Sequence, residues 1–97
     1  MPTREWKYKS VDLSAGTQTL ESVPCLVKSA KVTTALSAHV CEIDDDTTNV
    51  LAFPASSQIG DCINDDDGIR FETSLIVTPN ASATGRITIT YRRLREQ

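Results

Sequence analysis

The chain has 97 residues, of which 39% are hydrophobic and 5% aromatic, and its 10 basic and 13 acidic side chains give a formal net charge of −3. This length supports one domain with a thin core, because a chain of about 100 residues buries only about 60 to 65% of its unfolded surface, and self-association is therefore favoured. No run of about 18 apolar residues occurs and the first ten residues are polar, so we expect neither a membrane protein nor a secreted precursor.

The charge is unevenly distributed along the chain. Residues 1–9 carry three basic side chains against one acid, and residues 86–97 carry four against one. Residues 10–85 therefore carry a net charge of −8. This acidic body would repel phosphate, so we do not expect the basic ends to bind nucleic acid.

The chain begins with residues 1–14, which we predict to be an arm and connection; residues 15–97 are predicted to form a single β domain. In the arm, Trp6 and Tyr8 alternate with charged neighbours. This pattern fits a first strand that caps the core, and it also fits an arm that docks on a partner, since Trp, Tyr and Arg concentrate binding energy at interfaces. The two interpretations are compatible.

Strand signals dominate the following part of the chain. Residues 23–35 and 35–43 are short stretches rich in Val, Leu, Ala and Thr, and residues 47–55 form an apolar run typical of a strand buried on both faces. Residues 55–68 are predicted to be a loop, or to contain a short strand near Ile59–Ile63 that enters a turn.

The segment 68–93 has the strongest pattern. Residues 69–78, and again residues 86–92, alternate between apolar and polar side chains with period two, which indicates half-buried strands. Pro79 ends the first run, and Gly85 allows the chain to turn into the second. We predict that the two runs form a β-hairpin with a loop of about seven residues.

Six to eight short strands, with turn signals between them and no convincing helical period, predict an all-β fold. The expected architecture is a small β-sandwich or jelly-roll-like barrel of antiparallel strands. An OB-type barrel would usually need a helix between its third and fourth strands, and the sequence offers no candidate for one.

Two acidic clusters, residues 42–49 and 64–68, are the first candidates for metal binding. A calcium loop of the EF-hand kind needs alternating ligands, a mid-loop glycine and a distal glutamate, and this spacing is absent. We favour solvated turns in which Gly68 supplies a positive φ, with weak calcium binding across the two loops as the alternative.

Neither histidine nor cysteine chemistry is indicated. His39 lies two residues from Cys41, but this pair lacks the further ligands that zinc needs and the opposed geometry of a catalytic Cys–His pair. The three cysteines, which include Cys25 and Cys62, are odd in number and widely spaced, which favours free thiols. Catalytic and nucleotide-binding motifs are also missing, so we expect no enzymatic activity, no metal and no cofactor.

The C-terminal pattern resembles a known class of proteins. A Gly-Ile-x-Phe strand from Gly68, a Leu-x-Val stretch, a small-residue turn and Ile-x-Ile-x-Tyr-Arg from Ile87 are similar to the small structural proteins of tailed-bacteriophage virions, above all the capsid decoration, or cement, proteins. The resemblance extends from about Ala15 onward. It implies a non-enzymatic β-sandwich that is made in the bacterial cytoplasm and binds the major capsid protein on the virion surface, often as a trimer. Similar hairpins also occur in tail and fibre components, so a host-surface glycan-binding module is the alternative.

On this resemblance, we expect contacts to the capsid and to neighbouring protomers at the basic, aromatic arm and at the basic C-terminal end. These candidate residues are Arg4, Trp6, Lys7, Tyr8, Arg92, Arg93 and Arg95. The acidic loops at residues 44–46 and 65–67 are expected to face solvent. The arginines of the last strand could instead guard a sheet edge, in which case reversing their charge would reduce solubility rather than capsid binding.

Overall fold

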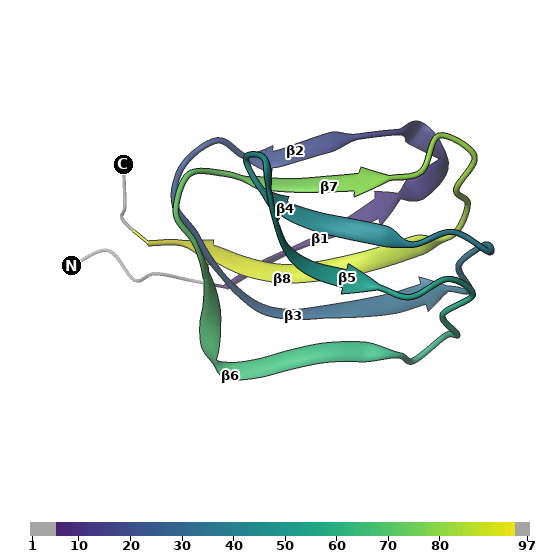
Figure 1. The fold of residues 1–97 in the computed structure, drawn as a ribbon. Coiled ribbons are helices and arrows are strands. Elements are labelled where there is room, and N and C mark those ends of the chain that lie inside the picture. Colours follow the sequence, from purple (N-terminus) through teal and green to yellow (C-terminus); the bar gives the residue numbers. More distant parts are fainter. Residues whose placement is uncertain (1–5, 95–97) are drawn as a thin grey trace.

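The structure, a computed structural model, describes residues 6–94, which form two packed four-stranded antiparallel sheets (Figure 1). The strands are β1 (Lys7–Asp12), β2 (Gln18–Glu21), β3 (Cys25–Thr34), β4 (Cys41–Asp45), β5 (Thr48–Phe53), β6 (Cys62–Phe71), β7 (Leu75–Pro79) and β8 (Arg86–Arg93). A short 3₁₀ helix, η1 (Leu13–Ala15), joins β1 to β2.

The strand order identifies the architecture. The first sheet has the order β1-β8-β3-β6 and the second sheet the order β2-β7-β4-β5. Each sheet thus combines strands from both halves of the chain, as in an eight-stranded jelly roll built from two Greek keys. The predicted all-β sandwich of the jelly-roll type is confirmed.

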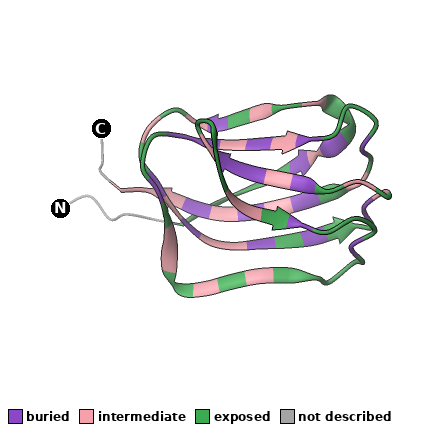
Figure 2. Cartoon of the chain, viewed as in Figure 1, coloured by how far each residue is buried: buried purple, intermediate pink, exposed green. Residues whose placement is uncertain are grey.

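The core lies between the two sheets and is built by alternation along each strand. In β8, Ile87, Ile89 and Tyr91 are buried, while the residues between them reach the outer face of the first sheet. Figure 2 shows this alternation as bands along the strands. The largest fully buried side chains are Phe71, Leu13, Ile43, Leu75, Ile87, Ile89, Val11, Val27, Val32, Val77, Cys25 and Cys41.

The predicted hairpin between residues 69–78 and 86–92 is wrong. The first run is not a single strand: β6 ends at Phe71, β7 begins at Leu75, and the two strands belong to different sheets. β8 pairs with β1 and β3 rather than with β7. Because both sheets direct their apolar side chains into one core, the period-two pattern runs on through the crossing and hides it.

One carboxylate holds the crossing from β6 to β7. Asp45, at the end of β4, accepts hydrogen bonds from the backbone N–H groups of Glu72 (2.8 Å), Thr73 (2.9 Å) and Ser74 (3.1 Å). The Ser74 hydroxyl accepts a further bond from the backbone N–H of Asp46 (3.0 Å). Desolvation alone would raise the pKa of Asp45, but the three backbone hydrogen bonds outweigh it and lower the pKa.

The expectation that residues 44–46 face solvent is therefore wrong for Asp44 and only partly correct for the half-exposed Asp45. The Asp45 carboxylate is occupied by the amides of the crossing, and Asp44 is only 8% exposed. Asp46 is exposed and adopts a positive φ of 54°, which fits its place in a tight turn. This acidic cluster is a structural turn that ties the second sheet to the end of β6.

Residues 7–12, which the sequence predicted to be part of an arm, form the edge strand β1. It pairs with β8 over six residues, from Lys7 opposite Tyr91 to Asp12 opposite Arg86. Val11 is fully buried, so this segment does cover part of the core. The interpretation as a first strand is the one that the structure supports.

Two further strands differ from the prediction. The run at residues 47–55 is not buried on both faces, because β5 is an edge strand of the second sheet and only Phe53 among its residues is buried. For residues 55–68, which were predicted to be a loop or to contain a short strand near Ile59–Ile63 that enters a turn, the structure has a strand that starts later, at Cys62, and continues to Phe71 as β6. Pairing with β3 passes directly from Ile69 to Asn64, so the acidic residues 65–67 bulge out of the sheet edge.

Gly85 occupies a point where three segments converge. Its carbonyl accepts a hydrogen bond from the backbone N–H of Leu13 (3.0 Å), and its φ is +112°. A Cβ at this position would lie 2.7 Å from the carbonyl oxygen of Ala35, 2.8 Å from Cδ2 of Leu36 and 3.0 Å from the carbonyl oxygen of Thr34. Both the dihedral angle and the lack of space therefore require glycine.

Replacing Asp45 by asparagine should lower the free energy of unfolding by about 1 to 2 kcal/mol at pH 7, because the amides of the crossing lose a charged acceptor that water only partly replaces. The folded pKa is lowered, so this contribution is complete above the unfolded pKa of about 3.9 and disappears as the pH falls through the folded value. Urea unfolding at a series of pH values measures it. The gap between wild type and variant should close in acid, whereas Asp66→Asn, at an exposed position of the bulge, should leave stability unchanged. A gap that stays constant down to pH 2 would contradict the assignment.

Gly85→Ala should destabilise the fold by about 2 to 4 kcal/mol, since it adds steric overlap with two backbone carbonyls to the strain of a positive φ. Gly60→Ala is the matched control, because Gly60 has a φ of +96° but open space around its Cβ position. Thermal or urea unfolding of both variants separates the two effects. Equal losses in the two variants would show that the overlap at Gly85 is relieved by small shifts.

Candidate binding surface on the outer face of the first sheet

Aromatic and basic side chains from three neighbouring strands meet at one end of the first sheet. Tyr8 lies on β1 on the face opposite to the buried Val11, and it is 79% exposed. Trp6, which precedes β1, is 37% exposed. Arg92 on β8 and Lys28 on β3 lie against the Trp6 ring. We refer to Trp6, Tyr8, Lys28 and Arg92 as the basic–aromatic platform.

The Trp6 ring is held by two cations. The Nζ atom of Lys28 lies 5.4 Å from the ring centroid and the Cζ atom of Arg92 lies 5.2 Å from it. Both distances are within the range of about 6 Å over which a cation is attracted to an indole ring, each contact being worth about 0.5 to 1 kcal/mol at an exposed site. The indole is therefore fixed in place while part of its surface remains open to solvent.

Arg92 has unused hydrogen-bonding capacity. Within residues 6–94, its buried Nη1 atom has no hydrogen-bond partner. A guanidinium presents five N–H donors, and a buried donor without an acceptor is unfavourable. A carboxylate from a binding partner placed against the guanidinium would neutralise part of its charge.

Arg93 faces the other side of the sheet. Its Nε atom donates to the Oε1 atom of Glu21 at 3.0 Å, and the Glu21 side chain is largely buried. Since Glu21 belongs to β2, this ion pair joins the two sheets. Burial raises the pKa of the neighbouring Tyr91, and the Glu21 carboxylate adds to the shift.

The structure thus divides the candidate contact residues into three groups. Trp6, Tyr8 and Arg92 come together in the platform, whereas Lys7 shares the face of Tyr91 and Arg93 is bound to Glu21. The remaining two candidates, Arg4 and Arg95, lie outside the described residues.

Lys28 is the platform residue that sequence reasoning missed. A register shift between Val27 and Ser29 displaces it from the regular alternation of β3, where Val27 and Ala30 are both fully buried. Two buried residues three positions apart cannot alternate with period two, so this spacing was the available signal for a β-bulge.

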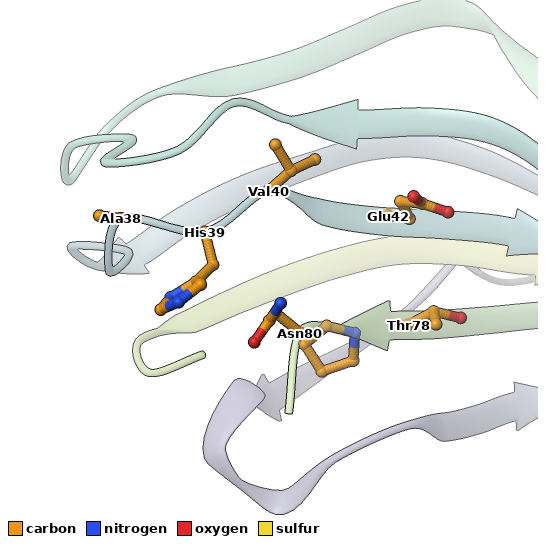
Figure 3. A pocket seen from close by; sticks show the side chains of 7 residues that line it. Ala38, His39, Val40, Glu42, Thr78 and Asn80 are labelled. Carbon is orange, nitrogen blue, oxygen red and sulfur yellow. The ribbon is translucent and has the colours of Figure 1, made fainter. Parts of the chain in front are cut away.

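A groove of about 470 Å³ lies on the second sheet, where β4 begins and β7 ends (Figure 3). The residues that line it are Ala38, His39, Val40, Glu42, Thr78, Pro79 and Asn80. The Ser37 hydroxyl lies 3.0 Å from Nδ1 of His39 and accepts a hydrogen bond from the backbone N–H of Thr84 (3.0 Å). The Nε2 atom of the His39 ring therefore remains as the ring atom that can contact a ligand. The Ser37 hydroxyl is already used in these two structural hydrogen bonds.

Two of the three cysteines offer little reactivity within the fold. Cys25 and Cys41 are buried free thiols, and desolvation raises the pKa of each to about 11, so almost no thiolate forms near neutral pH. Cys62 is a free and exposed thiol on β6. Within residues 6–94, no three His, Cys, Asp or Glu side chains lie close enough together to hold a metal ion. A search of the same residues for a helix long and apolar enough to cross a membrane found none.

Comparison with known proteins adds no relative: the sequence matches no family model and no curated protein. The interpretation of the surface therefore rests on the geometry of the platform and on the sequence pattern.

The single tryptophan of the chain allows the platform to be tested in solution by fluorescence quenching. Two cations beside Trp6 should attract iodide and repel caesium, so the quenching constant for iodide should exceed that for caesium, with neutral acrylamide as the reference for access. Arg92→Gln and Lys28→Gln should each reduce the difference, and Lys31→Gln, at an exposed position further along β3, should change it least. Equal quenching by both ions in the wild type would contradict the arrangement.

Proposed function

We propose that this chain is a non-enzymatic structural protein of a tailed-phage virion, a decoration protein that binds the major capsid protein and stabilises the shell. The observation that carries the proposal is the basic–aromatic platform, in which a cation-flanked Trp6 and the underused Arg92 are presented on an open sheet face. Trp, Tyr and Arg are the residue types that dominate binding energy at protein interfaces. Their positive charge suits an acidic protein surface.

The capsid as partner follows from the resemblance of the C-terminal pattern to decoration proteins. The jelly-roll fold is compatible with that role, since such folds are common in virion proteins, but a fold of this kind serves many functions and adds only an analogy. In this proposal the shell is stabilised by linkage: a protein that binds only the assembled shell shifts the equilibrium toward it. Trimeric assembly on the virion surface, which would supplement a small core, belongs to the same proposal.

The second candidate function is a tail or fibre module that binds a host-surface glycan. The groove on the second sheet favours it, because His39, Glu42 and Asn80 supply polar groups around an open hollow. A glycan site usually adds a Trp, Tyr or Phe side chain as a stacking surface, and none of these among residues 6–94 lines this groove. The platform on the first sheet is the better supported binding surface.

Arg92→Glu should abolish binding to purified capsids or weaken it at least tenfold, because the variant sets a carboxylate against an acidic surface and removes a cation from Trp6. Cosedimentation with capsids measures binding, and the temperature at which decorated shells break measures stabilisation.

Arg70→Glu is the matched control for this experiment. Arg70 is an exposed arginine at the β6 edge of the same sheet, two strands from Arg92 across Leu26 of β3, and it pairs with Glu72 at 2.7 Å. It should bind like the wild type. If Arg92→Glu binds capsids with unchanged affinity while its fold is intact, the platform is not the contact, and a glycan-array signal for the wild type would then favour the groove.

A further inference from the structure

The four edge strands of the sandwich are not equally protected. An edge strand exposes unpaired backbone N–H and C=O groups, and proteins usually guard it with bulges, charges or short length. β2 has four residues and a register shift against β7, β5 has a register shift against β4, and β6 carries the acidic bulge at residues 65–67. Within residues 6–94, β1 is the one edge strand that pairs in unbroken register, over six residues.

The side chains of β1 divide into an aromatic face and a basic face. Tyr8 lies on the outer face beside Trp6, while Lys7 and Lys9 lie on the face of their partners Tyr91 and Ile89. All residues of β1 from Lys7 to Ser10 are exposed. A strand added at this open edge would therefore meet lysine and aromatic side chains in alternation.

Charge argues against a second copy of this chain as the added strand. In an antiparallel pairing of two β1 strands centred on Tyr8, Lys7 of each copy would lie opposite Lys9 of the other, and like charges directly opposite one another destabilise a sheet. The acidic strand β6 would be complementary in charge, but its bulge interrupts the backbone ladder that pairing needs. The complementary occupant is an acidic segment of a different protein.

We propose that β1 accepts a fifth strand of the first sheet, an extended segment of the partner protein in which acidic and apolar residues alternate. Its carboxylates lie opposite Lys7 and Lys9, and its apolar side chains lie opposite Tyr8 and next to Trp6. Backbone hydrogen bonds along β1 provide the pairing, and the alternation fixes the register. The inference rests on the proposed function, since the segment belongs to the protein that the platform binds.

A synthetic seven-residue peptide with alternating glutamate and valine, blocked at both ends, is the probe. Titrated into the ¹⁵N-labelled full chain, it should shift the amide signals of β1 and the indole signal of Trp6. A peptide of the same composition with its glutamates placed together should bind about tenfold more weakly, because it cannot set both charges opposite lysines. Equal binding of the two peptides, or shifts centred on the groove at His39, would overturn the proposal.

Backbone methylation of the probe tests strand addition directly. In a paired strand, alternate N–H groups face the partner and the others face away. Methylation of one alternate set of peptide nitrogens should therefore abolish binding, and methylation of the other set should leave it nearly unchanged. If both methylated peptides bind equally well or equally poorly, the peptide docks by its side chains and the proposed fifth strand does not form.

Reversing the charge of Lys7 and Lys9 tests whether these lysines contact the carboxylates of the probe. The variant with Lys7→Glu and Lys9→Glu should no longer bind the glutamate–valine probe and should instead bind a lysine–valine probe of the same pattern. Lys31→Glu, on β3, should change the binding of neither probe. These experiments distinguish a failure of strand addition from a failure of the proposed function. If capsid binding depends on Arg92 but the two methylated probes behave alike, strand addition is contradicted and the decoration role is not. If the probe adds as a strand but the protein does not bind capsids, the decoration role is contradicted and strand addition is not.

Discussion

Arg92 and Arg93 are consecutive residues of β8 and therefore point to opposite faces of the first sheet. This alternation determines which side chains hold the two sheets together and which lie on the outer surface. On the inner side, Arg93 forms an ion pair with Glu21 of the second sheet and closes one end of the sandwich. On the outer side, Arg92 lies against Trp6 with a guanidinium nitrogen unpaired among the described residues. The basic C-terminal end therefore combines an ion pair between the two sheets on its inner side with a cation–π contact on its outer side.

The same constraint extends along β1. Val11 contributes to the core, whereas Tyr8 presents an aromatic ring to solvent and the lysines line the opposite side of an open edge. β1 can contribute to both the core and the surface because β8, an interior strand of the first sheet, pairs with it over six residues. The connections that complete the fold depend on single polar or conformational features, the Asp45 carboxylate at one crossing and Gly85 at another.

Alternation in the sequence was sufficient to predict the fold class and the strand at β8, which buries one face in the core. It did not predict β2, and the predicted strand at residues 35–43 begins six residues before β4. It was not sufficient for topology. Alternation runs on from Phe71 to Leu75 while the chain crosses between sheets, and the backbone contacts that mark this crossing come from Asp45, 27 to 29 residues earlier in the sequence. A cluster of aspartates that looks solvated in the sequence cannot reveal which of its members accepts distant amides.

The candidate site was predictable to the extent that it depends on residue type. Trp6, Tyr8 and Arg92 were identified because aromatic and arginine side chains in a charged context suit an interface. Lys28 was missed because a bulge places it there, and Arg93 differs from Arg92 only in the face to which its strand turns it. Sequence pattern identified the chemistry of the surface, and the pairing of three strands determined which residues share it.

Hydrogen–deuterium exchange of the protein with and without purified capsids tests the central claim most directly, because it locates the bound surface without a substitution. The platform as contact surface predicts slower exchange on binding in β1, in β3 around Lys28 and in the last residues of β8, with the second sheet unchanged. Slower exchange confined to the groove residues 38–42 and 78–80, with β1 unchanged, would contradict it.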